Sequence, residues 1–181
     1  EANSYRLILC QDQRLSVITG AMIEWAENPK ILGEAFRVIM NDWASEEVDY
    51  ESVGTTGLVQ SVLKAMRKHR GYEYLQDNGC GALGNLLLHR SSKERFVTKL
   101  DGLTAIAAAM KTFPGNACLQ LSGCIVISIL SELPELKDHL IEAGCVELAG
   151  SAFRLHKNTQ NADAATLRHL ARKIPIHLME A

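Results

Sequence analysis

The sequence lacks the features that mark secreted and zinc-binding proteins. Its five cysteines make an odd number, none of them form a CxxC pair, and no histidine pair lies at zinc-finger spacing. No Asn-x-Ser/Thr glycosylation sequon occurs. We therefore expect reduced cysteines that act as small hydrophobic core residues in an intracellular compartment, with one reactive cysteine as the alternative.

No hydrophobic run is long enough to cross a bilayer. The longest, Leu119–Leu133, is interrupted by polar residues and is shorter than the roughly 20 residues that a membrane-spanning helix needs. We interpret it as a buried helix and expect no membrane span. No signal peptide is visible, but the chain begins with Glu1 and not with methionine. We therefore expect a cleaved chain or a fragment in the cytoplasm, or in an organelle if a targeting segment has been removed.

An excess of charge is also absent. The 181 residues are 47% hydrophobic and 22% charged, with a formal net charge of −2. This composition is typical of a folded soluble protein with a sizeable core. It has neither the basic excess of many nucleic-acid-binding domains nor the acidic excess of a solvating tail.

Enzyme motifs are absent, with one apparent exception. No GxxxxGK[ST], HExxH, GxSxG or EF-hand spacing occurs. Gly79–Gly84 reads GCGALG, a literal GxGxxG, and Asp101 follows about 20 residues later. That fingerprint requires a preceding β-strand, whereas residues 70–78 are neither apolar nor β-rich. We interpret the match as a coincidence inside a helix, expect that NAD, FAD and ATP do not bind, and predict no catalytic, cofactor-binding or metal-binding residue.

The sequence does contain a repeat. Three stretches begin at Gly57, Gly102 and Gly144, which are 45 and 42 residues apart, and each continues with apolar residues on one helix face. A second landmark, Leu-Gln-x-x-Gly-Cys, occurs at residues 75–80 and 119–124, an offset of 44 residues. Short helices are predicted at 93–100 and 136–142. This three-helix unit has the period of HEAT and armadillo repeats.

The glycines of the repeat have two predicted roles. Gly57, Gly102 and Gly144 are expected to end the short helix in the left-handed conformation, so that the chain turns into the next helix. Gly79 and Gly123 lie within predicted helices, where glycine costs about 1 kcal/mol relative to alanine. We expect a neighbouring helix to approach closely at these two positions.

Three motifs resemble the armadillo repeat family. They are GCGALGNL at Gly79–Leu86, NACLQLSGC at Asn116–Cys124 and KDHLIEAG at Lys137–Gly144. The resemblance covers roughly residues 53–174. It is greatest to a divergent branch with a Lys/Arg-x-His or Lys-x-Phe-Pro turn after the second helix, here at Arg67–His69 and Lys111–Pro114. It implies an all-α fold, a right-handed α-solenoid of three-helix repeats, whose third helices line a concave groove that binds partner proteins.

The period divides the chain into armadillo repeats at 53–101 and 102–143 and a partial repeat at 144–181. Residues 1–52 fit less well. They contain two amphipathic segments, Leu15–Glu27 and Lys30–Trp43, but only 37 residues separate Gly20 from Gly57. We interpret this region as a degenerate repeat or an N-terminal cap, followed by an acidic loop.

The resemblance also implies which residues bind a partner. They are polar residues of the third helices, namely Gln76, Asn78, Asn85, His89, Gln120, Glu132, Arg168 and Arg172. In armadillo proteins that bind extended peptides, an asparagine at the Asn85 position bonds the peptide backbone, and a tryptophan lies four residues earlier. Here Gly81 takes the tryptophan position, and the next unit has Ile125 and Ile129. This departure argues against nuclear-signal binding of the importin kind. Asn85 either contacts a partner or satisfies a neighbouring backbone group.

The C-terminal third is basic. Residues 154–177 contain five lysines and arginines but a single acidic residue, Asp163. Arg168 and Arg172 share a helix face. This region is either a solvated helix face or a site for an acidic segment of a partner. Nucleic acid is disfavoured because no aromatic residues interleave with the charges.

These observations favour a non-catalytic protein-interaction scaffold that binds a partner through the concave groove. The alternative is a structural subunit of a large assembly that contacts neighbours through its ends and both faces. Tyr5–Cys10 and Ile174–Met179 are apolar, so we expect self-association, or burial of at least one end in an interface.

Overall fold

The structure, a computed structural model, describes residues 11–42, 57–88, 90–159, 165–170 and 174. Every regular element in these residues is a helix, and no β-strand occurs among them, which confirms the all-α prediction. The elements are α1 (Gln11–Glu24), α2 (Pro29–Asp42), α4 (Leu58–Lys68), α5 (Glu73–Leu86), α6 (Arg90–Thr98), α7 (Gly102–Thr112), α8 (Ala117–Ser131), the 3₁₀ helix η1 (Pro134–Leu136), α9 (Lys137–Glu142) and α10 (Cys145–His156). Tyr5–Cys10, most of the acidic loop and most of the apolar C-terminal segment lie outside the described residues.

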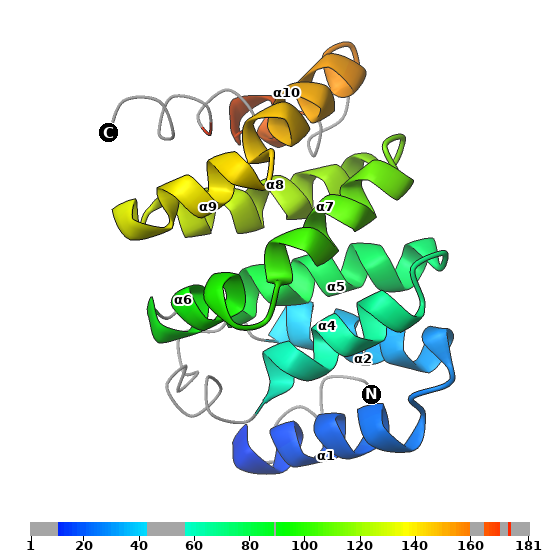
Figure 1. The fold of residues 1–181 in the computed structure, drawn as a ribbon. Helices are drawn as coiled ribbons and strands as arrows, with labels where there is room; N and C mark the ends of the chain where they lie inside the picture. Colours follow the sequence, from blue (N-terminus) through cyan, green and yellow to red (C-terminus); the bar gives the residue numbers. More distant parts are fainter. Residues whose placement is uncertain (1–10, 43–56, 89, 160–164, 171–173, 175–181) are drawn as a thin grey trace.

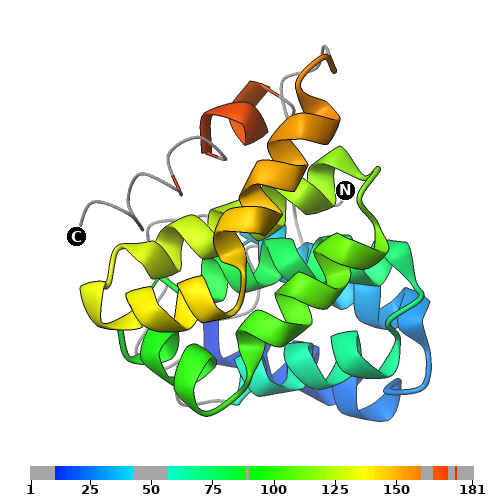
Figure 2. The same ribbon diagram turned by 45° about the horizontal axis from the view of Figure 1, so that its top comes forward.

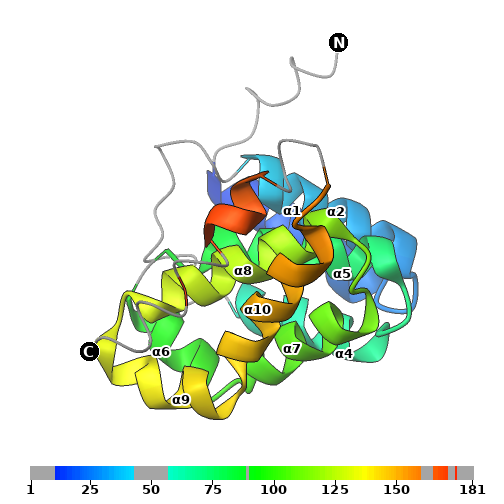
Figure 3. The same ribbon diagram turned by 90° about the horizontal axis from the view of Figure 1, so that it is seen from above.

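The helices form a stack that rises from α1 to α10 (Figure 1). Two rows run along it side by side (Figure 3). In the inner row, α5 packs between α2 and α8. In the outer row, α7 packs between α4 and α10. The two rows are joined because α4 packs on α5, and α7 on α8.

The inner helices start at a constant interval. α2, α5 and α8 begin at Pro29, Glu73 and Ala117, so successive starts are 44 residues apart. Asn28 and Asn116 stand directly before α2 and α8, and their side-chain oxygens accept backbone N–H groups of the first turn. Asparagine is a favoured residue at this capping position. The inner helix of the first pair, α2, therefore precedes α5 by the same interval by which α5 precedes α8.

The predicted turn glycines are right at two positions and wrong at the third. Gly57 and Gly144, directly before α4 and α10, have left-handed φ angles of 73° and 74°. In the middle unit Asp101 takes this conformation, with φ 50°, and Gly102 is already the first residue of α7. Aspartate adopts the left-handed conformation more readily than most residues. Gly102 is required for a different reason, since a Cβ there would lie 2.3 Å from the Phe96 ring.

Close helix packing explains the glycines inside helices, as predicted. A Cβ at Gly79 would lie 2.8 Å from Sδ of Met66, and one at Gly123 would lie 2.6 Å from Sδ of Met110. Each methionine belongs to the outer helix of the same pair. The outer helix therefore approaches the inner helix in the same way in both pairs.

The short helices α6 and α9 lie on the same side of the stack (Figures 1 and 2). They correspond to the short helices predicted at 93–100 and 136–142. Fully buried Phe96 anchors α6, and buried Leu136 and Leu140 anchor η1 and α9. Lys93 of α6 donates to Glu132, at the end of α8, over 2.6 Å. The short helix of one unit is thereby tied to the inner helix of the next.

Among the described residues, no single helix has the length and hydropathy of a membrane span. One pair of consecutive helices has this length and hydropathy when the two are taken together. They are Ala117–Ser131 and Pro134–Glu142, and the chain bends by 115° between them.

Candidate binding surface

Two of the predicted groove residues, Gln76 and Gln120, are buried at 2% and 3% exposure. The Gln76 amide nitrogen donates to the carbonyl oxygens of Met66 and His69, at 2.9 and 3.0 Å. Gln120 donates in the same way to the carbonyl oxygens ten and seven residues before it, at 2.8 and 3.2 Å. The last carbonyls of a helix have no partner within the helix. Both glutamines supply that partner to the preceding outer helix, so their amide nitrogens are already bonded inside the protein.

The two asparagines of α5 are also bonded inside the protein. Asn78 is buried, and its Nδ2 donates to the Tyr74 carbonyl oxygen over 2.7 Å. Nδ2 of Asn85 donates to the Met40 carbonyl oxygen over 2.7 Å, at the C-terminal end of α2. Of the two roles considered for Asn85, the structure shows the second, in which it satisfies a neighbouring backbone group.

Arg168 repeats the role of the glutamines at the next turn. It donates to the carbonyl oxygens of His156 and Thr159, at 3.1 and 2.8 Å. In each case one carbonyl belongs to the last turn of the outer helix, His156 in α10 and Met110 in α7, and the other lies just after it. Arg168 thus closes a turn.

The remaining predicted groove residues do not form a common surface with the residues above. Glu132 is exposed and pairs with Lys93, whose side chain is 8% exposed. His89 and Arg172 lie outside the described residues. The structure therefore does not bring the eight predicted residues together.

The GxGxxG match lies within α5 and not at its start, as predicted. Gly79 faces Met66, and a Cβ at Gly81 would lie 2.4 Å from Sδ of Met40. Backbone N–H groups in the middle of a helix are bonded to carbonyls one turn earlier, so they are not available to a pyrophosphate as the groups of a helix N-terminus are. That NAD, FAD and ATP do not bind stays a prediction.

Burial makes three of the thiols poor nucleophiles. It raises the pKa of Cys124 and of Cys145 to about 12. It likewise raises the pKa of Cys80, which is fully buried. The thiolate is the reactive and metal-binding form, so at neutral pH these three side chains act as hydrophobic core residues. Cys118 is exposed. Among the described residues, no group of three His, Cys, Asp or Glu side chains is placed to bind a metal.

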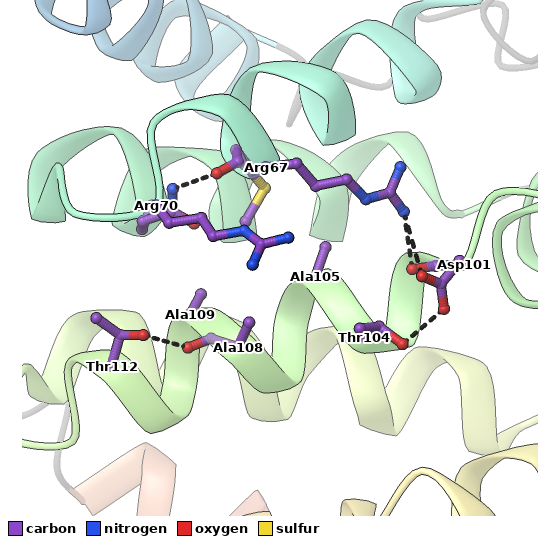
Figure 4. Close-up of a pocket in the computed structure, with 10 residues that line it drawn as sticks. Arg67, Arg70, Asp101, Thr104, Ala105, Ala108, Ala109 and Thr112 are labelled. Atoms are coloured by element: carbon purple, nitrogen blue, oxygen red, sulfur yellow. Dashed lines mark hydrogen bonds and ion pairs between the residues drawn. The ribbon is translucent and has the colours of Figure 1, made fainter.

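The outer row carries a hollow between α4 and α7 (Figure 4). Its volume is about 90 Å³, which suits the end of one side chain. Small side chains of α7, Ala105 and Ala108 among them, form one wall, and Arg67 and Arg70 line the α4 side. The hollow exists because these α7 residues are too small to fill the space between the two helices.

The two arginines of this hollow differ in their partners. Arg67 donates to the carbonyl oxygens of Leu100 and Asp101, and its guanidinium lies 3.9 Å from the Asp101 carboxylate. Arg70 is exposed and extends over the α7 alanines (Figure 4). Within the described part of the chain, no hydrogen bond or ion pair engages its guanidinium. Arg70 therefore offers an uncompensated positive charge at the hollow.

A second hollow, of about 460 Å³, lies at the equivalent place between α7 and α10. The two hollows are lined by equivalent residues. The α7 and α8 residues of the second hollow lie 44 residues after the α4 and α5 residues of the first, and its α10 residues lie 43 residues after the α7 residues of the first. The pairs are Met66 with Met110, Arg67 with Lys111, Arg70 with Pro114, Gln76 with Gln120, Asp101 with Gly144, Thr104 with Glu147, Ala105 with Leu148, Ala108 with Ser151 and Thr112 with Leu155.

The two hollows have opposite net charge. Two arginines and the single carboxylate of Asp101 line the first, which leaves one positive charge. Lys111 and the carboxylates of Glu142 and Glu147 line the second, which leaves one negative charge. The second is lined by larger apolar side chains, among them Leu155, which is 59% exposed.

Neither hollow was predicted from the sequence. The small residues of α7 are visible in the sequence, but they lie about 40 residues from Arg67 and Arg70 and meet them only when α4 packs on α7. The repeat is the one feature of the sequence that bears on the hollows, because it relates the residues that line the second hollow to those that line the first.

Comparisons with known proteins add a partial likeness. No protein-family model matches the chain, and no solved structure matches it. The chain is 28% identical over 129 residues to protein aardvark of Dictyostelium discoideum. The match covers 65% of this chain but 17% of that protein, so the chain spans a small part of the relative's length. This likeness assigns neither a family nor an activity.

Proposed function

We propose that the chain is a right-handed armadillo-like solenoid that serves as a non-catalytic protein-binding scaffold. The observation that carries this proposal is the repetition of a surface feature: the hollow between α4 and α7 recurs one unit later, between α7 and α10. A surface that repeats with the unit suits a partner segment that contacts several units at once.

The armadillo assignment is supported by the order of the helices. Short α6, outer α7 and inner α8 follow one another, as short α9 is followed by outer α10. The interval of 44 residues between the inner helices lies within the roughly 40–47 residues of HEAT and armadillo units.

The binding surface that we propose is the outer row. The inner-row side chains that the resemblance implied, Gln76, Asn85 and Gln120, already donate to backbone carbonyls. In the outer row, Arg70 and Leu155 are exposed at the hollows. Exposed side chains around a concave surface are available to a partner without breaking internal bonds.

Blocking both hollows tests this proposal. The double variant Ala108→Trp, Ser151→Trp introduces a large ring at equivalent positions of the two hollows. The natural partner is first identified by cross-linking the unmodified chain in its own cell and by mass spectrometry. We expect the double variant to capture this partner at least tenfold less, while circular dichroism shows unchanged helicity.

The matched control is Ser122→Trp with Ser128→Trp, because both serines are half-buried on the inner helix α8. Capture that survives in this control and is lost with the blocked hollows supports the outer row. Loss in the control alone would place the partner on the inner row. The absence of any protein cross-linked to the unmodified chain would contradict the scaffold function.

A structural subunit is the second candidate, favoured by apolar side chains on and after α1. Val17, Ile23 and Trp25 are 60%, 73% and 46% exposed. Exposed apolar side chains that together form one large patch are usually covered by another protein surface. Light scattering checks this candidate: a mass that stays at 19.9 kDa at all concentrations, for a chain that also captures no neighbours in cells, would exclude it.

A further inference from the structure

We propose that the two hollows bind an extended segment of a partner protein that carries an acidic side chain and, three residues away, a lysine or arginine. The acidic side chain enters the hollow between α4 and α7, and the basic one enters the hollow between α7 and α10. This inference rests on the proposed function and adds the chemistry and the spacing of the partner.

The first hollow is suited to a carboxylate. The Arg70 guanidinium lies over the hollow without an internal partner in the described residues (Figure 4). Arg67 stands beside it, anchored by the carbonyls of Leu100 and Asp101, so that its charge is held in place. The planar guanidinium matches the geometry of a carboxylate, with two parallel N–H···O bonds. The volume of about 90 Å³ admits the end of an aspartate or glutamate side chain.

The second hollow is suited to a long basic side chain. Pro114, Leu148 and Leu155 offer apolar contact to the methylene stem of a lysine or arginine. Glu142 and Glu147 are exposed at the same hollow and attract the positive charge at its end. The larger volume, about 460 Å³, accommodates the longer side chain.

The distance between the hollows sets the spacing in the partner. One helix, α7, separates them, and packed helices lie roughly 8–10 Å apart. A chain in the polyproline II conformation rises about 3.1 Å per residue with three residues per turn, so side chains i and i+3 point the same way about 9 Å apart. On a partner helix, side chains i and i+3 lie only about 5–6 Å apart, so a three-residue spacing reaches both hollows only from an extended segment.

Short fluorescent peptides and the full chain test the inference by anisotropy. The cores Glu-Pro-Pro-Arg and Arg-Pro-Pro-Glu present the pair in the two chain directions, and the prolines favour the polyproline II conformation. We expect one of the two to bind, at least fivefold tighter than the neutral core Gln-Pro-Pro-Gln and the shortened core Glu-Pro-Arg. Added salt should weaken this binding, because the charges are exposed.

Variants of the chain assign each charge to its hollow. Arg70→Glu and Glu147→Lys should each weaken the favoured peptide by about five- to tenfold. Lys64→Glu is the matched control, since Lys64 is an exposed cation on α4, less than two turns before Arg70 in the sequence and outside the hollow, and it should change affinity less than twofold. The double variant Arg70→Glu, Glu147→Lys should prefer the peptide with the opposite order of charges.

Several results overturn the inference. These are failure of both charged cores to bind better than the neutral core, equal binding of the shortened core, or an Arg70→Glu effect no larger than that of Lys64→Glu. A natural partner that is lost on blocking the hollows but is insensitive to Arg70→Glu would also overturn it. That last result would leave the scaffold function standing.

Discussion

The inner and outer rows of helices bond their polar side chains in different ways. On the inner row, Gln76, Asn85 and Gln120 donate to backbone carbonyls of neighbouring helices. On the outer row, Arg70 extends over a hollow in which no described group pairs with it. The difference follows from position, because α5 packs against α2, α4 and α8 and its side chains meet helix ends on several sides.

This difference teaches that a polar residue at regular spacing in a helical stack is not by itself a binding residue. Each outer helix ends in carbonyls that lack partners within the helix. The inner helix of the same unit bonds one of them with a glutamine, the Met66 carbonyl of α4 and the Met110 carbonyl of α7. The repeated glutamine therefore reflects a repeated structural need, and binding residues have to be sought where no such need exists.

Truncating a core leucine of the inner row should have the largest effect. Leu83 of α5 is fully buried, so Leu83→Ala should lower the free energy of unfolding by about 2–5 kcal/mol. Leu155→Ala removes the same atoms at a site that is 59% exposed on the outer row, and its effect should stay within about 0.5 kcal/mol. Urea denaturation measures both, and equal losses would contradict the distinction between the rows.

Removing a glutamine of the inner row should have an intermediate effect. Gln120→Leu retains most of the volume but removes the bond to the Met110 carbonyl oxygen, while that of Phe113 still accepts the backbone N–H of Asn116. An unsatisfied buried polar group costs about 1–3 kcal/mol, and Gln76→Leu should cost a similar amount. Gln60→Leu on the exposed surface of α4 is the control. A loss at Gln120 no larger than at Gln60 would refute the structural role of the amide.

The smallest effect concerns a surface contact between α2 and α5. Oη of Tyr74 donates to Oε1 of Glu34 over 2.7 Å, and this bond, followed by that from Arg37, lowers the pKa of Glu34. Tyr74→Phe should raise the pKa of Glu34 toward its ordinary value of 4.5, as followed by NMR titration. Tyr72→Phe, at an exposed tyrosine two residues earlier, should leave it unchanged.

The sign of the pH dependence follows from the lowered pKa. Because the pKa of Glu34 is lower in the folded protein, the contact contributes to stability above about pH 4.5. The contribution is lost as the pH falls through the lowered value, where Glu34 is protonated in both states. An effect of Tyr74→Phe on stability that grows below pH 4 would contradict this assignment.

Much of the fold could be predicted because its signals are local. The short helices, the left-handed Gly57 and Gly144, and the close approach at Gly79 and Gly123 all follow from hydrophobic period and glycine placement. The error at Asp101 has a local cause as well. A glycine follows it directly, and the sequence does not reveal that Gly102 is needed against the Phe96 ring.

The candidate site could not be predicted in the same way. Gln120 and Arg70 are both long polar residues near the start or end of a helix, and nothing local separates them. The armadillo resemblance placed binding on the inner row, where the structure shows internal bonds at Gln76, Asn85 and Gln120. The hollows themselves depend on packing between units, which the repeat alone does not specify.

The sequence by itself determined that the chain is helical and that its helices recur about every 44 residues. These properties depend on contacts within a few turns of one helix, which apolar spacing and capping residues encode. Only the tertiary structure decided which polar side chains are free. That depends on whether a carbonyl from another helix lies within hydrogen-bond distance, as it does for Gln120, or whether a neighbouring helix leaves space, as α7 does beneath Arg70.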